Sequence, residues 1–493
     1  MNLKILSLTA LTLLPLPGHA EELNTLFGYA LLVEKGTSLQ GDTQVLARFI
    51  LEPKDKKDLK KDLCNKLELR GPSGAKPVHG KIVQRDNPDP ESLPVVVCEA
   101  LVDFADTYRP QGETWKVTLG KYSYEVTLPT AVKTPQRAIL LGDTGCRDKK
   151  GTQTCEDASW PFAETIPRDI AKLVEDRVPT ILVHMGDYKY RKKGEDDDKS
   201  RVWQNWKKDL FLPIAHGDGT KTTSPNLFAV GPWVAARGNH ELCRSFGDNG
   251  PGWFLFLDPS STLLGDKSLP RCQGSQETVT PAHRLDFGHG FSIVTTDSAS
   301  LAEGKANAAQ AEALRQTLTA VDQSFGKKGR LAWWLTHKPI FSAVNDPPKI
   351  ANATEQAAVA ALPGKTPPGN IKLMVGGHKH FHQSVEAPGM PPQLVIGNGG
   401  VAINCQGFNS DKNPLNAAIR TTSTYGFVEA RLQSKEKAVT GWSLNVHAYP
   451  GTSGWGQPEV VQRCTYPATG PACTVLKPEF FPVAKCASGD EED

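Results

Sequence analysis

The chain has 493 residues, which is longer than one ordinary domain and enough for a large core with a smaller module beside it. Lysine and arginine together number 56 against 54 aspartates and glutamates, so no global basic field favours nucleic acid as a partner. Composition and charge therefore offer no argument for nucleic-acid binding, and they do not indicate an activity.

The first 20 residues have the pattern of a secretory signal peptide. Lys4 precedes an apolar run from Ile5 to Leu16, and a small-residue ending predicts cleavage before Glu21. The run is too short to span a bilayer and no nearby cysteine could carry a lipid, so we expect no membrane anchor. The pattern predicts a secreted or periplasmic protein.

The cysteine count agrees with an oxidising compartment, because the chain has 10 cysteines, an even number. Cys64 and Cys98 form a natural pair, since no other cysteine precedes Cys146. A bond between Cys146 and Cys155 would close one short loop. The sequence does not determine the remaining connectivity.

Residues 21 to 135 contain short runs of β-branched and aromatic residues separated by turn residues. Pro-Ser-Gly at 72–74, Asp-Asn-Pro-Asp-Pro at 86–90 and Arg-Pro-Gln-Gly at 109–112 lie at hairpin or loop spacing. We therefore expect a small antiparallel sandwich that carries no catalytic residues. The expected strands are 44–51, 66–70, 79–84, 95–104, 115–119 and 122–128.

After residue 135, strands alternate with helical segments, which indicates an α/β fold. The pattern predicts a strand over 137–141, a helix within 162–174 and a strand starting at Ile181. Asp143 and Asp187 each follow one of these strands, in Gly-Asp-Thr-Gly and Gly-Asp-Tyr-Lys-Tyr. Two carboxylates at neighbouring strand ends repel each other, and a cation would remove the repulsion.

The segment around Asp187 offers a second hard oxygen ligand. An apolar run ending in Gly-Asp is typical of a buried parallel strand, and sites form at the ends of such strands. Tyr190 could place a phenol oxygen on the same cation, a pairing suited to a trivalent metal. The alternative is a turn aspartate with a tyrosine packed beside it.

Further ligand types follow later strands. A strand over 228–236 leads to Asn239 and His240 in Gly-Asn-His-Glu, a strand over 331–335 leads to His337, and a strand over 371–375 leads to His378 and His380 in Gly-His-Lys-His. An amide oxygen is a neutral hard ligand, and two imidazoles two residues apart can be aimed around a metal pair. A lone histidine at a strand end is more often structural, but the ordered set of motifs favours a site.

This ordered set resembles the metal-binding signature of purple acid phosphatases, within the calcineurin-like metallophosphoesterases. The resemblance covers about residues 136 to 401. Two details favour the purple acid phosphatases over the rest of the superfamily. Gly145 stands where the other metallophosphoesterases have a ligating histidine, and Tyr190 is present to replace that ligand. Plant-type members also carry an N-terminal fibronectin-like domain, which fits residues 21–135.

The resemblance implies a binuclear centre of Fe³⁺ and a divalent metal, which would be iron, zinc or manganese. Asp187 would bridge the two ions. Asp143, Tyr190 and His380 would complete the iron site, and Asn239, His337 and His378 would hold the divalent ion. It also implies hydrolysis of phosphate monoesters by attack of a metal-bound hydroxide.

The chain departs from the family after His337, where many plant-type members carry further histidines that contact substrate. Asp346 and Pro347 stand there instead. His240 is then the best candidate for protonating the leaving group, with Asp346 as its competitor. The run 195–198 of acidic residues could suggest calcium, but it lacks ligand alternation and favours a solvated loop.

The sequence thus predicts a signal peptide (1–20), an all-β sandwich domain (21–135), an α/β catalytic domain (136–450) and a cysteine-containing C-terminal extension (451–493). The catalytic domain is expected to be a two-sheet β-sandwich flanked by helices, the metallophosphoesterase fold, with strands over 426–432 and 440–447 closing its second sheet. The expected substrate is a phosphorylated small molecule or protein. The alternatives are a phosphodiesterase or nucleotidase on the same metals, and a secreted binding protein that has lost activity.

Overall fold

The computed structural model describes most of the chain after residue 22. The described residues are 23–36, 39–72, 80–110, 112–147, 153–155, 159–191, 200–211, 226–243, 249–273, 277–326, 330–344, 349–350, 352–403, 409–411, 413, 415–436, 438–450, 456–466 and 472–481. The predicted signal peptide, the acidic run 195–198, Asp346 and Pro347 lie outside them.

The described part of the chain is a mixed α/β structure built around two large sheets. The larger has 11 strands, in the order β23-β22-β21-β20-β8-β9-β10-β1-β2-β5-β4, and the smaller has seven, in the order β11-β12-β13-β16-β18-β17-β19. The strands of the larger sheet are β1 (Leu23–Glu34), β2 (Thr43–Pro53), β4 (Val83–Gln84), β5 (Val96–Val102), β8 (Arg137–Leu141), β9 (Thr180–His184), β10 (Trp233–Ala235), β20 (Gly426–Lys435), β21 (Ala438–Ala448), β22 (Glu459–Tyr466) and β23 (Cys473–Val475). Those of the smaller sheet are β11 (His283–Asp286), β12 (Phe291–Thr295), β13 (Leu331–Leu335), β16 (Ile371–Gly376), β17 (His382–Glu386), β18 (Gln393–Ile396) and β19 (Ala418–Thr422).

Apolar residues on both faces of the central strands explain why they lie inside the molecule. Successive side chains of a strand point to opposite faces, so a strand buried on both sides has no polar alternation. In β8, Leu140 packs into the core shared by the two sheets, whereas Ile139 belongs to the core on the outer face. In β13, Trp333 faces the shared core and Trp334 faces outward.

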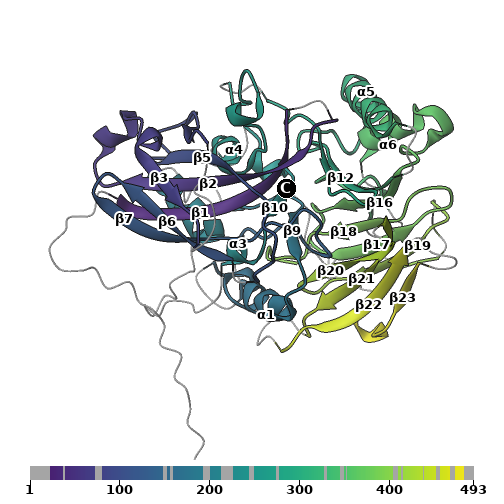
Figure 1. Ribbon diagram of the computed structural model, residues 1–493. Coiled ribbons are helices and arrows are strands. Elements are labelled where there is room, and N and C mark those ends of the chain that lie inside the picture. Colours follow the sequence, from purple (N-terminus) through teal and green to yellow (C-terminus); the bar gives the residue numbers. More distant parts are fainter. Residues whose placement is uncertain are drawn as a thin grey trace, which may run out of the picture.

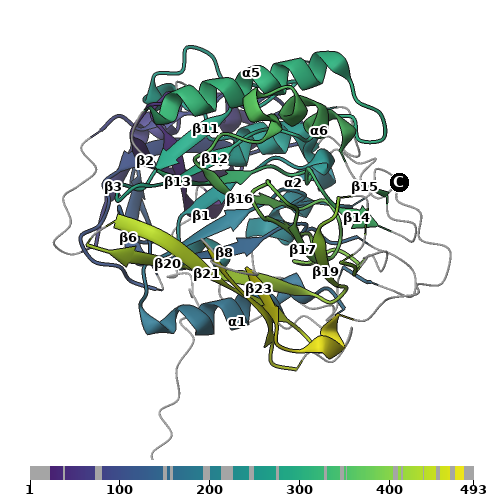
Figure 2. The same ribbon diagram turned by 90° about the vertical axis from the view of Figure 1, so that its right-hand side faces the viewer.

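Helices cover the outer faces of the two sheets. Helix α1 (Thr165–Leu173) places Ile166 and Ile170 in the core outside the larger sheet. Helices α5 (Ala308–Phe325) and α6 (Ala353–Ala360) pack outside the smaller sheet. Figure 2 shows the resulting layers, with α5 and α6 at the top and α1 at the bottom. The shorter helices are α2 (Ser200–Trp206), α3 (Leu227–Val230) and α4 (Asn249–Gly252).

The N-terminal region is a two-layer sandwich, but its larger layer is continuous with the central sheet. Strand β1 pairs in parallel with β10 through Leu31 and Trp233. Its second layer is a three-stranded sheet of β3 (Leu67–Arg70), β6 (Glu113–Leu119) and β7 (Tyr122–Leu128). The expected boundary at residue 135 therefore does not separate two independent sheets (Figure 1, purple and blue strands). Strand pairing over 200 residues apart has no local signal, which is why the continuity was not expected.

The C-terminal strands also belong to the larger sheet. Strand β20 pairs antiparallel with β8, so the prediction that 426–432 and 440–447 close a second sheet was wrong. Strands β22 and β23, within the expected extension 451–493, continue the same sheet (Figure 1, yellow). The strand expected over 228–236 is instead α3 followed by β10, because Gly231 and Pro232 interrupt the segment. A short pair, β14 (Ala343–Val344) and β15 (Lys349–Ile350), completes the strands that are described.

Four disulfides join described cysteines, which fits an oxidising compartment. The predicted pairs Cys64–Cys98 and Cys146–Cys155 are confirmed, and Cys243–Cys272 and Cys464–Cys473 are added to them. Cys405 and Cys486 lie outside the described residues. None of the helices that the structure describes has the length and apolar character needed to cross a bilayer.

Candidate metal centre

The predicted ligands meet where the carboxyl ends of strands from both sheets come together. Strands β8, β9 and β10 are parallel neighbours in the larger sheet, and β13 and β16 are parallel neighbours in the smaller one. Because parallel strands end at the same sheet edge, the loops that follow them converge. These loops carry the seven predicted ligands, Asp143, Asp187, Tyr190, Asn239, His337, His378 and His380.

One half of the cluster is rich in oxygen donors. The phenol oxygen of Tyr190 lies 2.7 Å from Asp143 Oδ1 and 2.7 Å from Asp187 Oδ2. It also lies 3.1 Å from His380 Nε2, and that nitrogen is 3.8 Å from Asp143 Oδ1. The four side chains predicted for the iron site thus present their ligand atoms to one another.

The other half combines one amide with two imidazoles. Asn239 Oδ1 lies 2.8 Å from His337 Nε2 and 2.7 Å from His378 Nδ1. His337 Nε2 is also 3.4 Å from Asp187 Oδ2. The ligand atoms of Asp187, His337 and His378 all lie within 4.8 Å of one another. Asp187 therefore contacts both halves of the cluster.

Three of these residues have an unusual backbone conformation. Asp143, Asp187 and His378 have φ values of 53°, 58° and 70°, in the left-handed region that most side chains avoid. Such conformations persist only where the surroundings enforce them, and they concentrate at functional sites. Gly377 allows a close approach, because a Cβ there would lie 2.4 Å from Asp143 Oδ2. The loops are shaped to bring these side chains together.

Glu241 holds two of the loops against each other, a role that sequence reasoning did not assign. Its Oε2 accepts hydrogen bonds from the backbone N–H groups of Asp187 and Gly238, at 3.0 Å each, and its Oε1 accepts one from Tyr188 at 2.9 Å. The side chain is fully buried. Its position as the last letter of Gly-Asn-His-Glu was the available signal.

The two imidazoles of the nitrogen-rich half are fixed from behind. His337 Nδ1 lies 2.7 Å from the backbone oxygen of Met185, and His378 Nε2 lies 2.9 Å from Glu303 Oε1. Hydrogen bonds of this kind determine which ring nitrogen carries the proton. Glu303 was also not found from the sequence, because it lies in a loop without a motif.

Burial and the neighbouring charged groups shift the pKa values of several predicted ligands. Burial raises the pKa of Asp143 to about 7, and the charge of Asp187 adds to the rise. Burial also disfavours the charged form of Asp187, but the charges and hydrogen bonds of His337 and His240 together outweigh it and lower the pKa of Asp187. Burial would lower the pKa of His337, yet Asp187, with smaller contributions from Asp143 and the backbone of Met185, raises it to about 9. Burial and the two carboxylates raise the pKa of Tyr190 well above its ordinary value. Two acidic groups therefore keep protons that a cation would displace.

His240 lies beside this cluster and is half-buried. Its backbone N–H donates to Asp187 Oδ1 at 2.9 Å, and its ring centre lies 4.1 Å from that of Tyr190. Burial lowers the pKa of its imidazole, and Asp187 opposes this shift. The structure therefore places His240 next to the predicted iron ligands, whereas its competitor Asp346 is outside the described residues.

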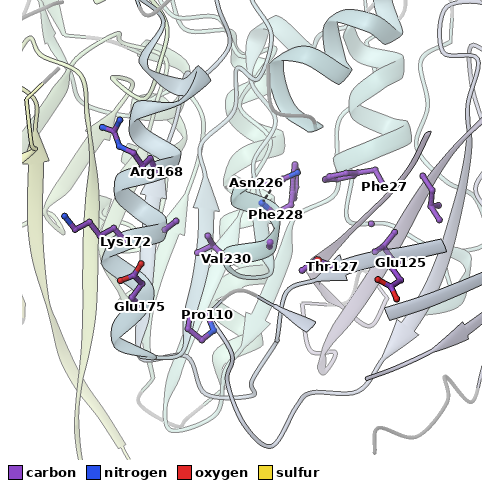
Figure 3. A pocket seen from close by; sticks show the side chains of 15 residues that line it. Phe27, Pro110, Glu125, Thr127, Arg168, Lys172, Glu175, Asn226, Phe228 and Val230 are labelled. Atoms are coloured by element: carbon purple, nitrogen blue, oxygen red, sulfur yellow. Dashed lines mark hydrogen bonds between the residues drawn. The ribbon is translucent and has the colours of Figure 1, made fainter. Parts of the chain in front are cut away.

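A cavity of about 810 Å³ lies elsewhere in the molecule and contains none of the predicted ligands. Figure 3 shows Arg168 and Lys172 of α1 on one side and Phe27 and Thr127 on the other. Size alone would make this cavity a candidate ligand site. The converging polar side chains and shifted pKa values are at the cluster of predicted ligands instead, which we therefore take as the candidate functional site.

Comparisons with known proteins do not assign a family. No protein-family model matches the sequence, and no curated protein matches it at a significant level. Among solved structures, the chain is similar to one described as "GAP50 the anchor in the inner membrane complex of Plasmodium", with 14% sequence identity, a TM-score of 0.28, and coverage of 62% of this chain and 87% of that one. Similarity this weak supports no conclusion about fold or function.

Proposed function

We propose that the chain is an exported, purple acid phosphatase-like phosphohydrolase that uses two metal ions to cleave phosphate monoesters. One observation carries the proposal: all seven predicted ligands converge, with Asp187 in contact with both halves of the cluster. Seven residues spread over more than 230 positions would not meet in this way if each were a separate turn or core residue. The two-sheet arrangement with outer helices is compatible with the metallophosphoesterase fold, which we propose as the finer fold assignment.

The donor set suits the two ions that the resemblance implies. Carboxylate and phenol oxygens around Tyr190 are hard donors suited to Fe³⁺, and the amide and two imidazoles around Asn239 suit a divalent ion. Asp143, Tyr190 and His380 would hold the first ion, Asn239, His337 and His378 the second, and Asp187 both. When bound, the ions would supply Lewis acidity and lower the pKa of a water molecule.

The protein's own groups would then orient and protonate the substrate. His240 adjoins the cluster and is partly accessible, so its imidazole N–H can donate to a phosphoryl or leaving-group oxygen. Glu241 holds the loops of Asp187 and Asn239 together, because its Oε2 accepts hydrogen bonds from the backbone N–H groups of Asp187 and Gly238. Such bracing limits the movement of the ligands, which a site of this kind requires.

Elemental analysis of the purified protein, combined with activity on monoesters and diesters, tests the proposal. We expect two metal equivalents that include iron, and faster cleavage of monoesters. Asp187→Ala should lose both ions, whereas Asn239→Ala should lose mainly the divalent ion. Asn87→Ala is a matched control, because Asn87 donates to the backbone oxygens of Leu93 and Val95, in the N-terminal region.

The outcomes separate the alternatives. Faster diester cleavage with the same metals would indicate a phosphodiesterase or nucleotidase. Two bound metals without activity on either ester class would indicate a binding protein that kept the site. Retention of both metals in Asp187→Ala would refute the bridging role.

A second experiment tests His240. If it protonates the leaving group, His240→Ala should keep its metals but lose about 10²–10⁴-fold in kcat on alkyl phosphates. The loss should be smaller on nitrophenyl phosphate, whose leaving group departs without a full proton. An equal loss on both substrates, together with a leaving-group-dependent loss in Asp346→Ala, would assign the role to Asp346.

A further inference from the structure

Glu303 contacts the side of the His378 ring that faces away from the other predicted ligands. Glu303 Oε1 lies 2.9 Å from His378 Nε2, while His378 Nδ1 lies 2.7 Å from Asn239 Oδ1. The carboxylate and the predicted ligands thus occupy opposite nitrogens of one imidazole.

This arrangement determines which nitrogen of His378 can bind a metal. A neutral imidazole has one N–H and one lone pair, and a carboxylate can only accept. With Nε2–H donating to Glu303, the lone pair is on Nδ1 and points toward Asn239. In His337 the backbone oxygen of Met185 takes the Nδ1 side, which leaves Nε2 for the cluster. When both rings are neutral, as metal ligands must be, the two neighbouring imidazoles are thereby set in opposite tautomers.

Two lysines hold the carboxylate of Glu303 in place. Lys338 Nζ lies 3.0 Å from Oε1, and Lys379 Nζ lies 3.4 Å from Oε2. Each lysine directly follows a predicted ligand in the sequence, namely His337 and His378. Because the three charged groups come from the loops after the adjacent parallel strands β12, β13 and β16, the topology itself brings them together.

The loop that carries Glu303 is anchored on both sides. On the α5 side, Ala302 N–H donates to Gln310 Oε1 at 3.0 Å, and Gln310 Nε2 donates to the Ser300 oxygen at 3.0 Å. On the α6 side, the N–H of Ala353 donates to the backbone oxygen of Glu303 at 2.8 Å. A side chain on so constrained a loop meets His378 with little loss of conformational freedom, as preorganised sites require.

We propose that Glu303 is a positioning residue that fixes the tautomer and orientation of His378. Lys338 and Lys379 hold the Glu303 carboxylate in position. The inference rests on the proposed function, since it assigns His378 to the divalent metal. Glu303 would act through His378 and would not itself touch substrate. Removing an outer partner of this kind typically weakens metal binding about 10–100-fold.

The test measures the affinity of the divalent site directly, by competition with a chromogenic chelator, and records the visible spectrum with Co²⁺ in that site. Glu303→Ala should bind the divalent ion about 10–100-fold more weakly and show an altered Co²⁺ spectrum. Glu303→Gln should recover part of the affinity, because its amide oxygen can still accept from Nε2–H. Glu429→Ala is the matched control, since the Glu429 carboxylate also pairs with two basic side chains, those of Arg137 and Arg431, away from the cluster.

The outcomes distinguish the inference from the proposed function. If the unmodified protein binds no divalent ion, the proposed function fails and the inference fails with it. If it binds the ion, and both Glu303 variants keep its affinity and Co²⁺ spectrum, only the inference is overturned. If Glu303→Ala does not fold, as judged by circular dichroism, Glu303→Leu replaces it, because a leucine side chain cannot accept the hydrogen bond from Nε2–H. Unchanged affinity and spectrum in that variant would overturn the inference.

Discussion

Adding a single methyl group at Gly238 tests the packing of the cluster without removing a ligand. A Cβ at this position would lie 2.0 Å from Asp187 Oδ1, 2.2 Å from Asp187 N and 2.7 Å from Glu241 Oε2. Gly238 has φ −93° and ψ 170°, which any residue can adopt. The effect of Gly238→Ala would therefore be entirely steric.

The size of the effect follows from these distances. Real Cβ atoms essentially never approach closer than 3.0 Å, so Asp187 must move by about 1 Å. Its N–H donates to Glu241, and its carboxylate accepts from Tyr190 and from the N–H of His240, so the movement breaks existing contacts. Overpacking of this kind costs about 1–3 kcal/mol, which leaves a typical domain folded. The displacement is about twice the ~0.5 Å that a preorganised site tolerates, and a misplacement of about 1 Å can lower the rate ~10²-fold.

Denaturant unfolding and elemental analysis of Gly238→Ala measure the two consequences. We expect a lower midpoint of unfolding together with a lower metal content. Gly369→Ala is the control, because a Cβ there meets nothing within 4 Å, and it should leave both quantities unchanged. If Gly238→Ala matches the unmodified protein in midpoint and metal content, the close approach of the two loops is refuted.

Three further predictions concern Tyr190, Asp143 and the disulfide between Cys64 and Cys98. Tyr190→Phe should abolish a visible charge-transfer band of the iron-loaded protein. The control Tyr188→Phe loses only a hydrogen bond to a backbone oxygen and should keep the band. A band that survives Tyr190→Phe would exclude Tyr190 as a phenolate ligand. The pKa of Asp143 is raised to about 7 and a metal ligand must lose its proton, so the metal affinity of the chelator-stripped protein should rise from mildly acidic to neutral pH. Calorimetry in two buffers of different ionisation enthalpy measures the protons that are released on binding. A metal affinity independent of pH would contradict this prediction. Replacing Cys64 and Cys98 together by serine opens a loop of 34 residues and should lower the free energy of unfolding, measured by guanidinium titration, by ~4 kcal/mol. A change below ~1 kcal/mol would show that this disulfide does not stabilise the fold.

The strand ends that carry the predicted ligands could be located from sequence because their signal is local. Apolar runs place β8 at Arg137–Leu141 and β13 at Leu331–Leu335, in agreement with the expected spans. Every residue of β8 is buried, as expected for a strand covered on both faces. Strand β10 was harder, because it has only three residues and follows a short helix that is equally apolar.

Sheet membership could not be predicted in the same way, because it depends on pairing between distant segments. The parallel pairing of β1 with β10 joins residues about 200 positions apart, and neither strand carries a feature that selects the other. The same holds for β20, which pairs with β8 although almost 300 residues separate them. Local sequence patterns could therefore predict most of the strands, whereas the order of strands in each sheet depends on long-range packing.

The candidate site depends both on local motifs, which supply the ligands, and on the packing of the two sheets, which brings the ligands together. Asp143, Asp187 and Asn239 follow strands of the larger sheet, whereas His337 and His378 follow strands of the smaller one. The apolar core between the sheets brings the two groups of loops together, so each half of the cluster depends on residues far from it in sequence. Motifs could identify the ligands because a ligand must be a particular residue type. The bracing groups Glu241 and Glu303 were not assigned this role, because many side chains can brace a loop and only the folded structure shows which one does.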